Sequence, residues 1–168
     1  QLDYAIEKKL PVKYVMIDAG LYADFVVLSI KEKNLFYVAG VRITNKVSIT
    51  NRKRDSIGNI QGSLKPSDYR RFKINGEKYY IHTREVYTRG VGKEKLIISY
   101  KKGDENTKKI YTTNIFHLSD EGLMHLLLKR WKVEELHRDE KQHLGLEDYQ
   151  GRKFGGIQKG VLAILVAY

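Results

Sequence analysis

Apolar positions in the first 41 residues predict a strand, a helix and a second strand. Residues 12–17 form a near-continuous apolar run, typical of a strand in a sheet that is covered on both faces. Residues 23–33 show helical spacing, and residues 35–41 are again a short apolar strand. The helix side chains expected to face inward are Phe25, Val26 and residues 28–30. This order predicts an α/β sheet with a right-handed crossover.

From residue 42 the pattern becomes that of a β-rich segment. Residues 42–54 are polar and basic, which favours a loop or a ragged hairpin. Antiparallel strands are expected over residues 79–87, 96–100 and 110–113. Asn75-Gly76 is a strong signal for a two-residue hairpin turn, and residues 102–106 predict a looser turn.

Helical patterns mark both ends of the chain. Residues 1–9 have apolar side chains at helical spacing, and a long helix should follow Ser119 and reach about residue 144. Ser119 is a good N-cap, and Asp120 favours the positive end of the helix dipole. Residues 157–168 suit a buried closing helix. We therefore expect an α/β part over residues 1–41, a basic β-rich insertion over residues 42–112, and C-terminal helices over residues 113–168 that complete the core.

The positive charge is concentrated in the expected insertion. The chain has 31 Lys and Arg against 20 Asp and Glu, a net charge of +11. Residues 41–112 hold 18 basic and 7 acidic side chains, whereas the flanking parts are balanced at 5 and 5 and at 8 and 8. This segregation predicts a surface that faces a polyanion. The basic residues at the start of the segment are Arg42, Lys46, Arg52, Lys53 and Arg54.

The composition of the chain bears on its cellular compartment. The chain has no Cys, which excludes a disulfide framework, a thiolate nucleophile and a Cys-based zinc site. No apolar run approaches the roughly 20 residues that span a bilayer, and the first residues lack the basic and apolar regions of a signal peptide. We expect a cytoplasmic protein without membrane insertion.

Four residues of the long helix carry the candidate chemistry. Leu127, Arg130, Glu134 and Lys141 are separated by three, four and seven residues, so they project from roughly one helix face. Taken alone, Arg130 and Glu134 are more simply explained as a surface i,i+4 ion pair.

The order of these residues resembles the C-terminal signature of DDE-type insertion-sequence transposases, Y-x2-R-x3-E-x6-K. Three of its four positions match at the right spacing, and Leu127 replaces the Tyr. The segment Tyr14-Val15-Met16-Ile17-Asp18-Ala19-Gly20-Leu21-Tyr22 is similar to the strand of that family that ends in the second catalytic Asp. The two matches span almost the whole chain.

The resemblance implies an RNase H-like catalytic core that cleaves and joins DNA at transposon ends. Asp18 and Glu134 would hold Mg²⁺ or Mn²⁺, hard cations that require oxygen ligands, for two-metal phosphoryl transfer. Arg130 and Lys141 would hold DNA phosphates beside the scissile bond. It also implies a nucleoid-associated protein; a homodimer on the DNA ends stays open.

The family's first catalytic Asp has no counterpart here. Seventeen residues precede Asp18, room for a helix but not for the first three strands of an RNase H-like sheet, and Asp3 falls in the helical segment. We therefore expect a partial RNase H-like core, the C-terminal portion of the catalytic domain. Such a portion should be a poor catalyst by itself.

Several residues and functions have alternative interpretations. Asn114 is more simply a strand-end or turn residue than a substituted catalytic Asp. His137 and His143 are six residues apart, off the i,i+4 spacing of a helical zinc pair. The alternative functions are a catalytically inactive, transposase-derived DNA-binding module and a remnant without function.

Overall fold

The computed structural model describes residues 7–9, 11–50 and 53–130. The chain divides into two compact units, Tyr14–Met124 and a second made of Gln1–Lys13 with His125–Tyr168. The first unit contains helices and one sheet of parallel and antiparallel strands. The helix expected over residues 157–168, the long helix beyond residue 130 and most of the helix expected over residues 1–9 lie outside the described residues.

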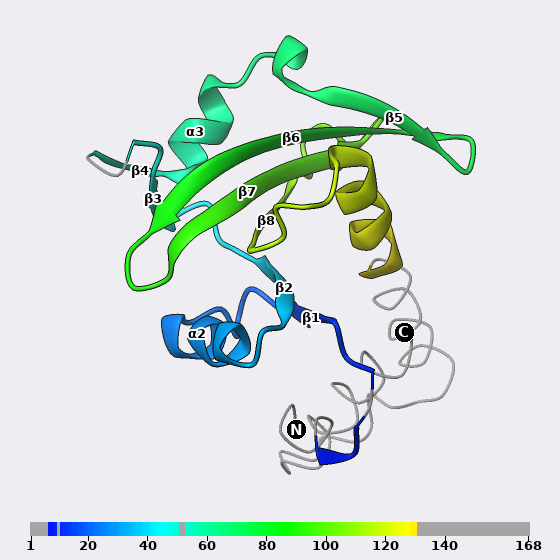
Figure 1. Ribbon diagram of the computed structural model, residues 1–168. Coiled ribbons are helices and arrows are strands. Elements are labelled where there is room, and N and C mark those ends of the chain that lie inside the picture. Colours follow the sequence, from blue (N-terminus) through cyan, green and yellow to red (C-terminus); the bar gives the residue numbers. More distant parts are fainter. Residues whose placement is uncertain (1–6, 10, 51–52, 131–168) are drawn as a thin grey trace, which may run out of the picture. The chain divides into compact units, whose positions relative to one another are not determined.

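The order of elements agrees with the α/β start and β-rich middle predicted from the sequence. The strands are β1 (Tyr14–Ile17), β2 (Phe36–Gly40), β3 (Lys46–Ser48), β4 (Arg54–Ser56), β5 (Arg70–Ile74), β6 (Glu77–Thr88), β7 (Gly92–Lys101) and β8 (Lys109–Thr113). The helices are α2 (Asp24–Glu32), α3 (Ile57–Ser63), the short 3₁₀ turn η1 (Pro66–Asp68) and a helix that begins at residue 120 and continues through residue 130. Figure 1 shows β6 and β7 as two long curved strands that run side by side.

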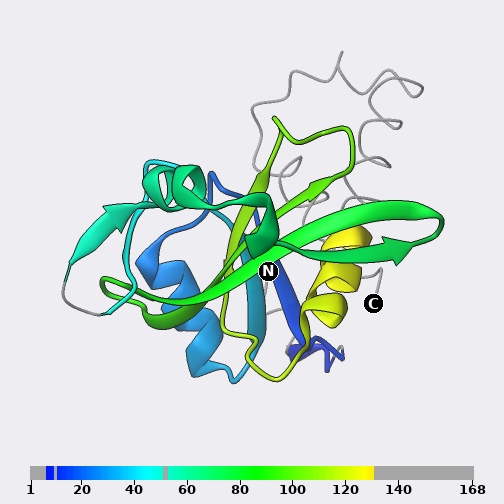
Figure 2. The same ribbon diagram turned by 90° about the horizontal axis from the view of Figure 1, so that it is seen from above.

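The sheet has the strand order β1-β2-β8-β7-β6-β3-β4, with β5 paired to β6. β1 and β2 are parallel and are joined through α2, whereas every other neighbouring pair among the described strands is antiparallel. Figure 2 shows α2 lying along β2. The predicted strand-helix-strand unit is thus confirmed, and β8 carries the chain from the β-rich segment back to β2.

The turn chemistry of the β-rich segment is as predicted. Asn75 and Gly76 join β5 to β6 and both have positive φ, 51° and 83°, the geometry of a type I′ hairpin turn. Residues 102–106 lie in the loop from β7 to β8, and residues 42–54 contain β3 and the start of β4, which form an antiparallel hairpin.

The sheet is buried most deeply at β7. Its residues Leu96, Ile97 and Ile98 are all fully buried although they alternate between the two faces, so both faces of β7 are covered. On one face, α3 contributes Ile57 and Ile60 to the core. The sequence pattern did not predict α3, because its glycines resemble a loop. The helix forms because Ser56 caps it by accepting the Asn59 N–H at 3.1 Å and because its two isoleucines are buried.

Two predictions about the first unit need correction. In α2 the buried residues are Val27 and Ile30, whereas Phe25 is 76% exposed and Leu28 is 38% exposed. The helix is therefore rotated relative to the expected face, since Val27 and Ile30 are the i,i+3 pair that meets the sheet. In β1 only Ile17 is fully buried, because β1 is the terminal strand in the described order and is not covered on both faces.

Candidate active site

Asp18 lies at the carboxyl end of the parallel strand pair. The register pairs Ile17 with Ala39, so β1 and β2 end at the same edge of the sheet, and Asp18 is the first residue beyond β1. Its side chain is exposed. The edge outside the carboxyl ends of parallel strands is where open α/β sheets bind ligands. The described structure therefore presents this carboxylate where a ligand can reach it.

The turn after β1 is held by backbone contacts. The Leu21 N–H donates to the Asp18 carbonyl at 2.9 Å, which closes a tight turn. Gly40, at the end of β2, allows the turn to approach closely, because a Cβ atom added there would stand 3.1 Å from the Ala19 nitrogen. The main chain around Asp18 is thus fixed from two sides.

A side-chain tie reaches the same turn from the middle of the sheet. Glu94 of β7 is fully buried, and its carboxyl accepts one hydrogen bond from each of two phenols. Tyr22 Oη donates to Oε2 at 3.0 Å, and Tyr37 Oη donates to Oε1 at 2.6 Å. Tyr22 follows Asp18 by four residues, whereas Tyr37 lies within β2.

The strand register explains why these groups meet. Ala39 pairs with Thr112, and Thr112 pairs with Leu96, so the three residues form one row across β2, β8 and β7. Two residues farther along, the corresponding row is Tyr37, Asn114 and Glu94, just beyond the end of β8. Asn114 accepts the Tyr37 N–H at 2.9 Å and donates to the Leu35 carbonyl at 3.1 Å. Asn114 is therefore a strand-end residue, as predicted.

The environment of Glu94 keeps both phenols protonated. Burial raises the pKa of Tyr37 far above its ordinary value, and the nearby Glu94 charge raises it further. The pKa of Tyr22 is raised by the same two causes, and the hydroxyls of Thr112 and Thr88 oppose the shift. Burial lowers the pKa of Lys31, and Glu94 opposes that shift. Both tyrosines therefore remain hydrogen-bond donors throughout the neutral range.

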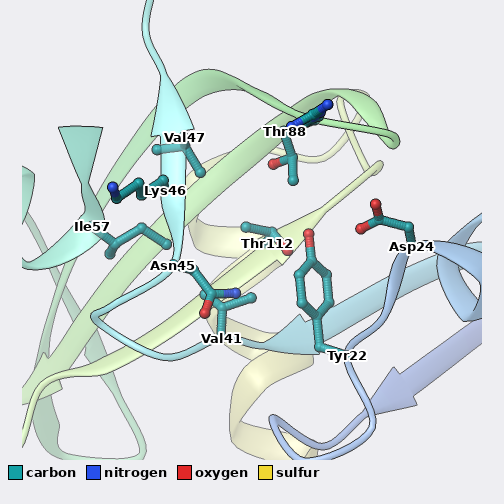
Figure 3. Close-up of a pocket in the computed structure, with 10 residues that line it drawn as sticks. Tyr22, Asp24, Val41, Asn45, Lys46, Val47, Ile57, Thr88 and Thr112 are labelled. Atoms are coloured by element: carbon teal, nitrogen blue, oxygen red, sulfur yellow. The ribbon is translucent and has the colours of Figure 1, made fainter. Parts of the chain in front are cut away.

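A cavity of about 220 Å³ adjoins Tyr22 (Figure 3). Asp24, Lys46 and Arg89 contribute charged side chains of both signs to its lining, and the Tyr22 phenol points toward the strands that carry Thr88 and Thr112. The hydroxyl oxygens of Thr88 and Thr112 are closed off from solvent. Thr88 and Thr112 nevertheless line the cavity, and their hydroxyl groups lie beside the Tyr22 phenol.

The predicted long helix begins as expected. Ser119 Oγ accepts the Gly122 N–H at 3.2 Å, which confirms the N-cap. Asp120, in the first turn, accepts from the Thr83 hydroxyl at 2.8 Å and from Arg70 at 3.1 Å. The start of the helix is thereby tied to β5 and β6.

The remaining signature residues are only partly described. Leu127 is fully buried, which explains an apolar residue at the position of the signature Tyr. Arg130 is partly exposed and is the last described residue. Glu134 and Lys141 lie outside the described residues, so their placement beside Asp18 stays a prediction.

The basic residues chosen from the sequence are surface residues where they are described. Arg42, Lys46, Lys53 and Arg54 are exposed, and Arg52 lies outside the described residues. Lys46 and Arg54 lie on β3 and β4, the hairpin at one end of the sheet order. Their side chains can therefore be reached from solvent.

No described residues form a group of three or more His, Cys, Asp or Glu side chains that could hold a metal ion. Within the described part of the chain, Asp18 therefore belongs to no such group. His137 and His143, the candidate zinc pair, lie outside the described residues.

Glu94 was not recognised from the sequence as a functional candidate. It stands between Lys93 and Lys95, so it reads as a solvent-exposed charge. The available signal was its spacing, because Glu94 is two residues before Leu96 and four before Ile98 and therefore lies on the same buried face of β7. A charged residue on an apolar face requires buried partners, which the sequence does not identify.

The comparison with protein families identifies the class of protein. Residues 5–168 match the family described as "Transposase DDE domain". The chain therefore belongs to the transposase DDE domain family, and that membership indicates transposase function with a DNA substrate and divalent metal ions. No curated protein matches the chain. Among the described residues, no helix is long and apolar enough to cross a membrane.

Proposed function

We propose that this chain is the C-terminal portion of an RNase H-like catalytic domain of an insertion-sequence transposase, which cleaves and transfers DNA strands by metal-assisted phosphoryl transfer. The observation that carries the proposal is the exposed Asp18 carboxylate at the carboxyl end of β1, in a chain that matches the family over residues 5–168. β1 and β2 would be two of the core strands, and residues 42–112 would be the insertion of the cut-and-paste members.

The metal site would be built on Asp18 and Glu134. Asp18 fits Mg²⁺ or Mn²⁺ in chemical type, because these hard cations take carboxylate oxygens and its side chain is exposed at a strand end. When bound, a pair of such ions activates the attacking oxygen and stabilises the leaving oxygen. The role of Asp18 is to hold a ligand oxygen fixed at the sheet edge, and Glu134 would approach from the long helix.

The basic residues would hold the DNA. Arg130, one helical turn before Glu134, and Lys141, two turns after it, would contact phosphates beside the scissile bond. Arg42, Lys46, Arg52, Lys53 and Arg54 would extend the contact along double-stranded transposon ends. We place the protein on the nucleoid in the cytoplasm, with a homodimer as the assembly to be tested on paired ends.

The proposed site contains two of the three carboxylates that the family uses, Asp18 and Glu134. Two carboxylates neutralise less of the charge of the metal ions than three do. We therefore expect slow DNA cleavage by this chain alone. A catalytically inactive DNA-binding module is the second candidate. It is favoured by the excess of 18 basic over 7 acidic residues in residues 41–112, which needs no metal site to bind DNA.

Metal binding tests the proposed site directly. We expect Mn²⁺ binding, measured by electron paramagnetic resonance, to weaken by about tenfold or more in Asp18→Asn and in Glu134→Gln. Asp24→Asn and Glu135→Gln are the matched controls, since they remove neighbouring carboxylates outside the proposed site. Equal Mn²⁺ affinity in wild type, Asp18→Asn and Glu134→Gln contradicts the metal site.

Metal-dependent DNA nicking separates the enzyme from the inactive module. Any nicking by the chain should vanish in Glu134→Gln and persist in Glu135→Gln. Duplex binding should weaken steeply with salt, and Lys46→Ala should reduce the salt slope by about 1, whereas Lys33→Ala, outside the basic segment, should leave it unchanged. A duplex affinity that does not change with salt concentration would contradict both the transposase and the DNA-binding module.

A further inference from the structure

Glu94 is a fully buried acidic side chain that the proposed chemistry leaves unused. It is fully buried in β7, and two phenols from other elements satisfy its two carboxyl oxygens. A buried carboxyl is costly unless hydrogen bonds replace its hydration, and an apolar residue of similar size would avoid that cost. The position of its partners, rather than its own burial, indicates what the group contributes.

One partner is attached to the turn that carries Asp18. The turn is short, because the Leu21 N–H closes on the Asp18 carbonyl at 2.9 Å and Tyr22 follows directly. Tyr22 Oη then reaches Glu94 Oε2 at 3.0 Å. The far end of the turn is therefore tied to β7 at the buried centre of the sheet.

The near end of the turn is fixed independently. β1 is registered to β2 up to the pair Ile17 and Ala39, and Gly40 leaves room for Ala19 at close range. Without the hydrogen bond from Tyr22 to Glu94, residues 18–22 would be held mainly by the pairing of β1 with β2 and by the hydrogen bond from the Leu21 N–H to the Asp18 carbonyl. A carboxylate on such a turn would sample more orientations, and metal affinity falls when a ligand is less well oriented.

We propose that Glu94 is a positioning residue for Asp18, and that it acts through Tyr22 to hold the Asp18 carboxylate in the orientation that binds the divalent ion. This inference rests on the proposed function, because it takes Asp18 as a metal ligand. It assigns Tyr22 to the same role and excludes Tyr37 from it.

Tyr37 provides the internal control. It donates to the other oxygen of the same carboxyl, at 2.6 Å, and is fully buried. It lies inside β2, which is paired on both sides by β1 and β8, and its N–H is held by Asn114. Loss of its hydroxyl should weaken the fold but should leave the Asp18 turn in place.

The experiment compares Tyr22→Phe with Tyr37→Phe in the full chain. Mn²⁺ affinity is measured by electron paramagnetic resonance, and amide hydrogen exchange at residues 19–22 is measured without metal. We expect Tyr22→Phe to weaken Mn²⁺ binding by about tenfold and to speed exchange in the turn. Tyr37→Phe should lower the thermal midpoint yet keep wild-type Mn²⁺ affinity and turn exchange.

A purely structural role for Glu94 predicts a different pattern. If Tyr22→Phe and Tyr37→Phe both keep wild-type Mn²⁺ affinity, or both lose it equally, the positioning role is overturned. Glu94→Leu serves as a third variant, because it removes both acceptor oxygens: it should resemble Tyr22→Phe in the turn, and Mn²⁺ affinity equal to wild type would overturn the role.

Asp18→Asn separates failure of this inference from failure of the proposed function. If Asp18→Asn binds Mn²⁺ as wild type does, the metal site is wrong, and the positioning role falls with it. If Asp18→Asn loses Mn²⁺ while Tyr22→Phe does not, the metal site holds and the positioning role alone fails.

Discussion

The edge strand β1 and the central strand β7 differ sharply in how firmly they are packed. In β7, Leu96, Ile97 and Ile98 have no exposed surface, and both faces of the strand are covered. In β1 only Ile17 is fully buried, and the side chain that follows it, Asp18, is exposed. The candidate chemistry thus lies on the less firmly packed of the two regions.

The central strand contributes most to the stability of the fold, whereas the edge strand carries the carboxylate that solvent can reach. A carboxylate at the centre of the sheet would be rigid but unreachable, whereas one at the edge is reachable but needs support. Glu94 provides that support, because it lies in β7 and binds Tyr22 beside the edge. The comparison predicts that substitutions in β7 mainly affect folding, and that substitutions around the turn after β1 mainly affect metal binding.

The largest expected effect is in the core of β7. Leu96→Ala should lower the free energy of unfolding by about 3 kcal/mol, because it leaves a cavity at a fully buried site. Met16→Ala, which removes a side chain of similar size from half-buried β1, should cost about 1 kcal/mol. Urea unfolding measures both. Equal costs would show that the edge is packed as tightly as the centre.

Alkaline pH should weaken the tie between the two regions. The folded pKa values of Tyr22 and Tyr37 are raised, so the stability they contribute is complete below the unfolded value of 10.0 and is lost as pH rises above it. Each raised tyrosine should add about 1.4 kcal/mol of lost stability per pH unit. The free energy of unfolding, measured with denaturant between about pH 9 and about pH 11, should fall less steeply with pH in Tyr22→Phe and in Tyr37→Phe than in wild type. An unchanged dependence on pH would contradict the hydrogen bonds of these phenols to Glu94.

A glycine substitution tests the close approach at the edge. Gly40→Ala should cost about 1 kcal/mol and weaken Mn²⁺ binding, because the new methyl group would press on Ala19 at 3.1 Å. Gly62→Ala, in α3 with open space around the added Cβ, should stabilise the protein by up to about 1 kcal/mol. Thermal unfolding and Mn²⁺ titration measure the pair. Wild-type Mn²⁺ affinity in Gly40→Ala would show that the turn tolerates displacement.

The smallest expected effect is that of Glu121, in the first turn of the long helix. Asp120→Asn should cost about 1 kcal/mol, because it weakens the hydrogen bond with Thr83 and the ion pair with Arg70. Glu121→Gln, an exposed change in the same helical turn, should cost only about 0.3 kcal/mol. Urea unfolding compares them. Equal costs would mean that Asp120 acts only through the helix dipole.

Much of this fold follows from local sequence signals. Asn75-Gly76 predicts its hairpin because both residues tolerate positive φ, and Ser119 predicts the start of its helix because its hydroxyl satisfies a free N–H. The parallel pairing of β1 and β2 follows from the strand-helix-strand order. Asp18 is a candidate from sequence because residues 14–22 are similar to the strand that ends in the second catalytic Asp of DDE-type transposases.

The contacts that link distant segments could not be predicted. Phe25 was expected to face inward, but the phase of α2 is set by the sheet it meets and not by its own apolar residues. Glu94 looked like a surface charge because its partners are 72 and 57 residues away in sequence. Pairing over such distances depends on strand order and register, which local patterns do not specify.

The length of chain between Tyr22 and Glu94 also has a kinetic consequence. The hydrogen bond joins residues 72 positions apart, so the loop it closes includes β2 to β6. Contacts of such long separation form late, because the entropy of closing the loop must be offset first. During synthesis the turn after β1 therefore emerges long before Glu94 does, and we expect the edge that carries Asp18 to be completed only after the β6–β7 hairpin has joined the sheet.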